Sequence, residues 1–289
     1  MTDLILPLGA EPASAVETAG QKAQQLSVLA QLGLPVPPGF VVTAAACRSL
    51  GDGAGPALQE ALRTGLANLE AATGRTLGGS GKPLIFSVRP SPLRTVPSPV
   101  EAVLNLGLND VTVEALGRES NDPRFAHECY RRLIQNYAHV VLGDDPSAFE
   151  DLFALYREER GYVSETEIRG VDAKEIAQRF KAQFESNNGK AFEEDPLAQL
   201  EQTLVAMARA WNGPRAKAQR KLHGVSEDLG DRLHRSGHGL WQWQRGLRRG
   251  PCLVARSAFR AAAHGRRVPA SRARAGHGGT AAPHHPSAR

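Results

Sequence analysis

The composition of the chain changes abruptly at Asp231, and this change limits what the chain can fold into. Residues 231–289 contain twelve arginines, no lysine and one acidic residue. Their net charge is therefore +11, whereas residues 1–230 carry −6, and the two add to the +5 of the whole chain. The terminal segment also lacks an apolar repeat at period 2 or 3.6. We therefore expect residues 1–230 to hold the folded core and residues 231–289 to be disordered.

The first hundred residues predict alternating helices and strands. Apolar residues recur at helical spacing within residues 15–33, and Gly33 stands where a glycine commonly ends a helix. The prolines of "LPVPPGF" exclude a helix, and the apolar "GFVVT" predicts a short buried strand. A second helix is expected over about 56–73, followed by a strand in "KPLIFSVR". This order predicts an α/β or α+β fold.

Residues from Asn109 to about Lys221 predict a helical region, because several helix starts can be recognised there. Three Asp-Pro pairs place an acid at an N-cap and a proline at the first helical position: Asp122-Pro123, Asp145-Pro146 and Asp195-Pro196. Asp172 with Glu175 has the spacing of a capping box. We expect a helical subdomain inserted into, or following, the α/β part.

The cysteines and the N-terminus indicate the cellular compartment. Cys47, Cys129 and Cys252 lie far apart, so neither a disulfide framework nor a CxxC metal site is indicated. The sequence "MTDLILPLGAE" lacks the basic region and the long apolar run of a signal peptide, and no window approaches ~20 apolar residues. We expect a soluble, cytoplasmic protein with no membrane partner.

Two segments carry candidate ligand-binding cations. In "AGQKAQQL", Lys22 lies at a helix start, where exposed N–H groups and an ammonium can meet a phosphate. A solvated helix start is the simpler interpretation of that segment alone. In "FSVRPSPLRTVPSP", a buried strand ends at Arg89 and a proline-rich loop carries Arg94. These arginines fit an anion site, although an arginine at a strand end more often forms a structural pair.

Five segments in the same order resemble the N-terminal nucleotide-binding domain of the pyruvate, phosphate dikinase family. They are "GLPVPPGF", "SVR", "VLNLGLND", "RFAHECYRRLIQNYAHVVLG" and "WNGPRAKAQRKLHGVSEDLG". The resemblance covers roughly residues 1–230 and is closer than that to phosphoenolpyruvate synthase.

The resemblance implies an ATP-grasp domain that binds MgATP and passes a pyrophosphoryl group to a histidine on a separate domain, which then serves a barrel that interconverts pyruvate and phosphoenolpyruvate. Lys22 matches the lysine of the family's "GGKGANL", and Arg89 matches the arginine of "SVRSGAR". By this resemblance Lys22 and Arg89, and with them Arg94, are the candidate nucleotide-binding residues. Cations beside a triphosphate offset charge that opposes binding and transfer. ATP and Mg²⁺ are the implied cofactors.

The chain departs from the family pattern within these same segments. Two family glycines are replaced by Gln21 and Ala23, and two more by Ser91 and Ser98. Prolines in the second loop also remove backbone donors that a phosphate cradle would use. These replacements weaken the expectation of ATP chemistry.

The terminal segment fits a shifted reading frame. Codons for residues 231–239, with suitable third bases, can be read one base later as Thr-Ala-Cys-Thr-Val-Gln-Ala-Met-Val, which resembles the strand that follows in the family. We therefore hypothesise that residues 231–289 are a frameshift product. An evolved basic arm is the alternative, because twelve arginines with Trp241 and Trp243 can bind nucleic acid nonspecifically. The histidines there show no coherent metal-ligand pattern.

These observations predict an α+β fold, an incomplete ATP-grasp domain. Residues 1–108 with 196–230 are expected to form its α/β subdomain, residues 109–195 the helical subdomain and residues 231–289 the disordered tail. We expect nucleotide binding at most and no dikinase turnover, since no histidine here matches the catalytic one. A non-catalytic module that binds a nucleotide or other subunits is the second hypothesis, with the remaining dikinase domains or a second copy as partners.

Overall fold

The fold is known from a computed structural model that describes residues 4–9, 16–50, 53–91, 101–223 and 239–243. All of these residues lie in one compact unit, Met1–Arg245. Helices and strands are mixed within this unit, so the predicted α+β class is confirmed at that level.

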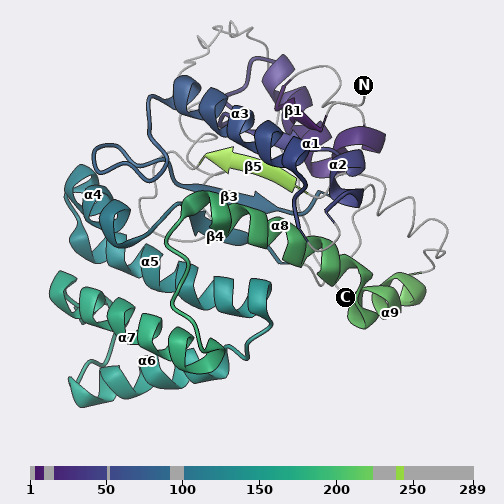
Figure 1. Cartoon of the computed structure of the whole chain (residues 1–289). Coiled ribbons are helices and arrows are strands. Elements are labelled where there is room, and N and C mark those ends of the chain that lie inside the picture. The colour runs from purple at the N-terminus through teal and green to yellow at the C-terminus, as the bar shows by residue number, and fades with distance from the viewer. Residues whose placement is uncertain (1–3, 10–15, 51–52, 92–100, 224–238, 244–289) are drawn as a thin grey trace, which may run out of the picture. The chain divides into compact units, whose positions relative to one another are not determined.

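A five-stranded sheet forms the centre of the described unit (Figure 1). Its strands are β1 (Ile5–Pro7), β2 (Phe40–Val42), β3 (Phe86–Arg89), β4 (Val103–Leu106) and β5 (Gly239–Trp243). The spatial order is β1-β2-β5-β3-β4, and every neighbouring pair is antiparallel. The predicted strands in "GFVVT" and "KPLIFSVR" correspond to β2 and β3.

Helices pack on this sheet directly or on the helices that contact it. They are α1 (Val16–Gln31), α2 (Ala44–Arg48), α3 (Pro56–Thr73), α8 (Pro196–Asn212) and α9 (Pro214–Leu222). Helix α1 contacts β2, α3 contacts β1, and α8 contacts β4. The strand residues Val41, Val42 and Phe86 are fully buried as a result, which explains why their segments are continuously apolar rather than alternating.

The remaining helices pack mainly on one another (Figure 1). They are α4 (Asp110–Ser120), α5 (Pro123–Tyr137), η2 (Ala138–Leu142, a π-helical turn), α6 (Ser147–Glu159), η3 (Glu165–Glu167) and α7 (Gly170–Asn188). Helix α5 packs against α4, α7 and strand β4, so it links this group to the sheet. Phe149 and Phe180 fill the core, with ring centroids 5.2 Å apart.

The helix-start predictions have mixed outcomes. Asp122 and Asp195 are the N-caps of α5 and α8, and each carboxylate accepts a backbone N–H. The prediction for Asp145 was one residue off, because Pro146 is the N-cap of α6 and the helix begins at Ser147. The Asp145 carboxylate still accepts the N–H of Ser147. The prediction for Asp172 was wrong, because α7 begins earlier at Gly170 and Asp172 is its third residue. The Asp172 carboxylate reaches back to the N–H of Arg169 and so supports that earlier start.

Strand β5 corrects the prediction of disorder over residues 231–289. Residues Gly239–Trp243 lie between β2 and β3 and pair with both. Main-chain pairing does not require apolar periodicity in the sequence, so the patterns that predict strands did not reveal this one. The rest of residues 231–289 lies outside the described residues.

Candidate functional site

Helix α1 is interrupted at Gly20, two residues before Lys22 in the predicted phosphate-contacting segment. The backbone of Gly20 has φ 78° and ψ 169°, so a new helical turn starts at Gln21. A Cβ atom at Gly20 would lie 1.7 Å from the carbonyl oxygen of Ser91. Only glycine satisfies both the conformation and the close approach. Gly20 therefore brings the helix start into contact with the segment that follows β3.

Ser91 fastens this contact through its side chain. Its hydroxyl oxygen accepts a hydrogen bond from the backbone N–H of Ala23 over 3.0 Å, and Ser91 is fully buried. Ala23 is the third residue after the interruption, and its N–H has no partner within the new turn. Ser91 therefore caps the helix from a distant part of the chain, as an N-cap side chain does locally.

The same junction brings two cations together. The pKa of Lys22 lies below its ordinary value of 10.5, first because burial disfavours the ammonium and second because the Arg89 guanidinium is near. The Lys22 residue as a whole remains exposed, so its charge is accessible from solvent. Two neighbouring cations repel each other, and an anion placed between them relieves that repulsion. The site is thus suited to a phosphate or another polyvalent anion.

The structure describes two of the three predicted site residues. Lys22 and Arg89, predicted separately, share one electrostatic environment. Arg94 lies outside the described residues. Sequence reasoning noticed Ser91 only as a replaced glycine and missed its hydrogen bond to Ala23. A small polar residue directly after a buried strand was the available signal, but it does not identify a partner 68 positions away.

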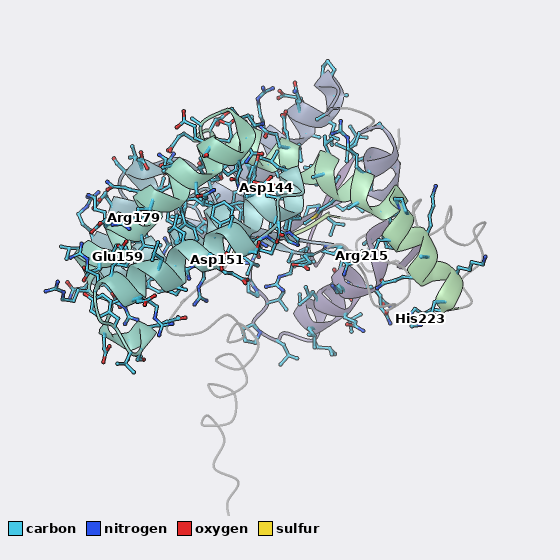
Figure 2. All side chains as sticks on the ribbon, turned by 90° about the horizontal axis from the view of Figure 1, so that it is seen from below. Asp144, Asp151, Glu159, Arg179, Arg215 and His223 are labelled. Atoms are coloured by element: carbon cyan, nitrogen blue, oxygen red, sulfur yellow. The ribbon has the colours of Figure 1, made fainter. Side chains whose placement is uncertain are left out.

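Polar clusters elsewhere in the described residues are internally satisfied and tie helices together. Lys181 Nζ lies 2.8 Å from Asp110 Oδ2 and 2.6 Å from Glu194 Oε1. The Tyr130 hydroxyl lies 3.1 Å from an oxygen of each of the same two carboxylates, so its single proton can be donated to either. Figure 2 shows another link, the Arg179–Glu159 pair between α7 and α6, at 3.0 Å. These contacts explain how the helices pack on one another.

A resident metal site is not found in the described part of the chain. No group of three or more His, Cys, Asp or Glu side chains there is arranged to hold a metal ion. No helix among the same residues is both long enough and apolar enough to cross a bilayer.

Comparisons with known proteins give a consistent result. The chain is 38% identical over 214 residues to pyruvate, phosphate dikinase from Rhizobium meliloti, a match that covers 73% of this chain and 24% of that protein. The enzyme from Clostridium symbiosum is 36% identical over 215 residues, with 73% and 25% covered. The chloroplastic pyruvate, phosphate dikinase 1 of Zea mays is 36% identical over 214 residues, with 73% and 22% covered.

Over the matched residues, this chain belongs to the pyruvate, phosphate dikinase family. The relatives come from bacteria, plants and protists and carry the same name. No general family profile matches the chain. The chain spans about a quarter of the length of the dikinases it matches.

Proposed function

We propose that this chain binds MgATP as the nucleotide-binding part of a pyruvate, phosphate dikinase, with the phosphates held by Lys22 and Arg89. The observation that carries the proposal is the contact between Gly20 and Ser91, which brings the start of the helical turn with Lys22 to the end of the strand with Arg89. The pKa of Lys22 is lowered first by burial and second by the nearby Arg89 guanidinium. Membership in the dikinase family supports ATP as the anion. Arg94, from the same loop, is proposed as a further phosphate contact.

The chemistry of the proposed site is electrostatic. Lys22 and Arg89 offset the negative charge of the phosphates, and the guanidinium can donate two parallel hydrogen bonds to phosphate oxygens. Mg²⁺ neutralises phosphate charge when bound, and it commonly keeps most of its ligands from phosphates and water. Because the described residues hold no carboxylate cluster for it, we propose that the ion arrives with the nucleotide.

Ser91 limits how the phosphates are held. The N–H of Ala23 already donates to the Ser91 hydroxyl, so it is not free to donate to a phosphate oxygen. The proposal therefore assigns binding to the two side-chain cations rather than to a cradle of backbone amides. Binding weaker than in a glycine-rich phosphate loop is expected.

The experiment is calorimetric titration of the full chain with MgATP, for the native sequence and for Lys22→Met, Arg89→Met and Lys82→Met. Lys82 is exposed in a turn and serves as the matched control. We expect native binding to weaken at least tenfold, about 1.4 kcal/mol, in the first two variants and to stay unchanged in Lys82→Met. Absence of native binding, or binding indifferent to Lys22→Met, would overturn the proposal.

The full reaction of the relatives is proposed only for polypeptides that include their remaining domains. For this chain we expect no phosphoenolpyruvate from ATP, phosphate and pyruvate, because none of its histidines matches the catalytic histidine of the family. A coupled assay on the purified protein measures this, and turnover would contradict it.

We propose an incomplete ATP-grasp fold in a cytoplasmic protein, with residues 1–108 and 196–230 as the α/β subdomain and residues 109–195 as the helical subdomain. Packing of α4, α5, α6 and α7 mainly on one another supports this division.

The frameshift hypothesis for residues 231–289 is kept as a proposal, supported by their arginine-rich, lysine-free composition. Strand β5 is an observation that it does not require. Sequencing of the DNA around the codon for Gly230 decides the matter: an intact frame that encodes this tail, without the family strand one base away, refutes the hypothesis.

A further inference from the structure

Strand β5 is the link between two halves of the sheet. Among the described residues, β2 and β3 pair with other strands but not with each other. One side of β5 pairs with β2, Leu240 opposite Val41. The other side pairs with β3, and the same Leu240 stands opposite Arg89. Removal of β5 would leave two separate strand pairs, β1–β2 and β3–β4.

The main-chain groups of β2 and β3 that face β5 are buried and require hydrogen-bond partners. Val41, Val42, Phe86 and Val88 are fully buried, so the backbone beside them is not exposed to water in the folded unit. Buried N–H and C=O groups without hydrogen-bond partners destabilise a fold. Main-chain pairing satisfies these groups whichever polypeptide supplies the strand.

Strand β5 is also the last strand of its compact unit. The unit ends at Arg245, two residues beyond β5. On its other side, α9 ends at Leu222, and about 15 residues lead from there to Gly239, enough to span roughly 50 Å when extended. The element that closes a unit, joined by a connection of this length, can be supplied by a neighbouring copy without changing any pairing.

We propose that the gap between β2 and β3 is a strand-acceptor site that takes β5 from a second copy of this chain, giving a strand-exchanged dimer. The pairings in the dimer are the same as in the monomer, antiparallel to both neighbours. The inference is independent of nucleotide binding, because it rests on the register of the strands and on where β5 lies in the unit.

Concentration decides which strand fills the gap. A strand tethered to its own unit by a short connection has an effective concentration on the order of millimolar. At about 100 µM protein, insertion of the strand from a second copy therefore accounts for roughly a tenth of the molecules. The exchanged fraction should rise about tenfold between roughly 10 and 100 µM in samples that are refolded together.

The test uses a disulfide that can form only across the β3–β5 pair. Ser87 stands directly opposite Gln242. Directly opposite residues of antiparallel strands have Cα atoms about 4.5–5.5 Å apart, which is within disulfide range. One full-length chain carries Ser87→Cys and another carries Gln242→Cys, both with Cys252→Ser to remove a background thiol. The two are unfolded, mixed, refolded and oxidised.

We expect a covalent heterodimer on a non-reducing gel, with the 87–242 disulfide identified by mass spectrometry. A chain carrying both substitutions is the register control and should form the bond within itself. A Ser80→Cys chain is the collision control, since Ser80 is exposed in a turn, and it should give no adduct with the Gln242→Cys chain.

Three results would overturn the proposal. The first is a register control that crosslinks while the mixed chains give no 87–242 adduct at any concentration. The second is an adduct that forms equally with Ser80→Cys, since random collision then explains it. The third is a register control that does not crosslink, because β5 then does not lie beside β3.

Discussion

The hydroxyl of Ser91 and the backbone N–H of Ala23 form a buried hydrogen bond between residues 68 positions apart. It joins the end of β3 to the restarted helix α1 and thereby sets the spacing of Arg89 and Lys22. Because this contact both stabilises the fold and positions the candidate site, we expect substitutions there to change the free energy of unfolding and the affinity for MgATP.

Removal of the Ser91 hydroxyl tests this contact. In Ser91→Ala the N–H of Ala23 loses its partner in a buried position, and we expect a loss of about 1–3 kcal/mol in the free energy of unfolding. Urea denaturation monitored by circular dichroism measures it. Ser80→Ala is the matched control, because Ser80 is exposed and Arg118 donates to its backbone carbonyl, which the substitution keeps. Equal stability of Ser91→Ala and the native chain would contradict the assignment.

A substitution at Gly20 has two costs, one from its left-handed backbone conformation and one from its close approach to Ser91, and a comparison with Gly33 measures them separately. Gly33 has a similar φ, +74°, but a Cβ atom there would meet nothing within 4 Å. Gly33→Ala should cost about 1 kcal/mol for the conformation alone. Gly20→Ala adds a collision with backbone and should cost more than about 3 kcal/mol, with loss of MgATP binding. Similar thermal denaturation midpoints for the two variants would show that the junction is looser than described.

The lowered pKa of Lys22 predicts that replacing this lysine, which is expected to weaken MgATP binding, raises the free energy of unfolding at neutral pH. The unfolded chain holds the Lys22 proton more tightly than the folded one, so the charged ammonium destabilises the fold at neutral pH. This penalty disappears as pH rises from the folded pKa towards 10.5. We therefore expect Lys22→Met to unfold at higher urea than the native chain at pH 7, with the difference shrinking in alkaline buffer. A less stable variant at pH 7 would contradict the sign.

Asp172 predicts a second pH dependence, in the helical region and at acidic pH. Burial would raise the pKa of its carboxyl, but hydrogen bonds from Tyr162 and Arg169 outweigh burial and lower the pKa below its ordinary 3.8. The stability it contributes is therefore present above about pH 3.8 and is lost as pH falls through the folded pKa.

Substitution of Asp172 measures that contribution. Asp172→Asn should lose about 1–3 kcal/mol at pH 7, because its donors lose a charged acceptor. The difference from the native chain should vanish in strong acid. Asp151→Asn, at an exposed position of α6 (Figure 2), is the control and should be as stable as the native chain at pH 7. A constant difference down to pH 2 would show that the charge of Asp172 is not responsible.

Local signals explain which parts of the fold could be predicted. The helix over about 56–73 coincides with α3 because Pro56 and Gly74 fix its two ends. The N-caps Asp122 and Asp195 were also predictable, since each bonds within its own first turn. Asp172 was misassigned because a carboxylate caps a helix equally well from its third position.

The candidate site depends on long-range contacts and was predictable only in pieces. Lys22 and Arg89 each stood out by residue type and position, but their meeting depends on Gly20 and Ser91. Strand β5 was missed for the same reason, since its place is set by two partners elsewhere in the chain. A sequence pattern carries information on the local conformation and little on such partners.

The position of β5 has a consequence for biosynthesis. Strands β2 and β3 end at Val42 and Arg89, but the strand that joins them is completed only at Trp243. A ribosome adding about 5–20 residues per second needs roughly 8–30 s to cover that interval. During this time the nascent sheet has two open edges able to pair with other polypeptides. Chaperone dependence and aggregation during expression should therefore respond to the translation rate between residues 89 and 243.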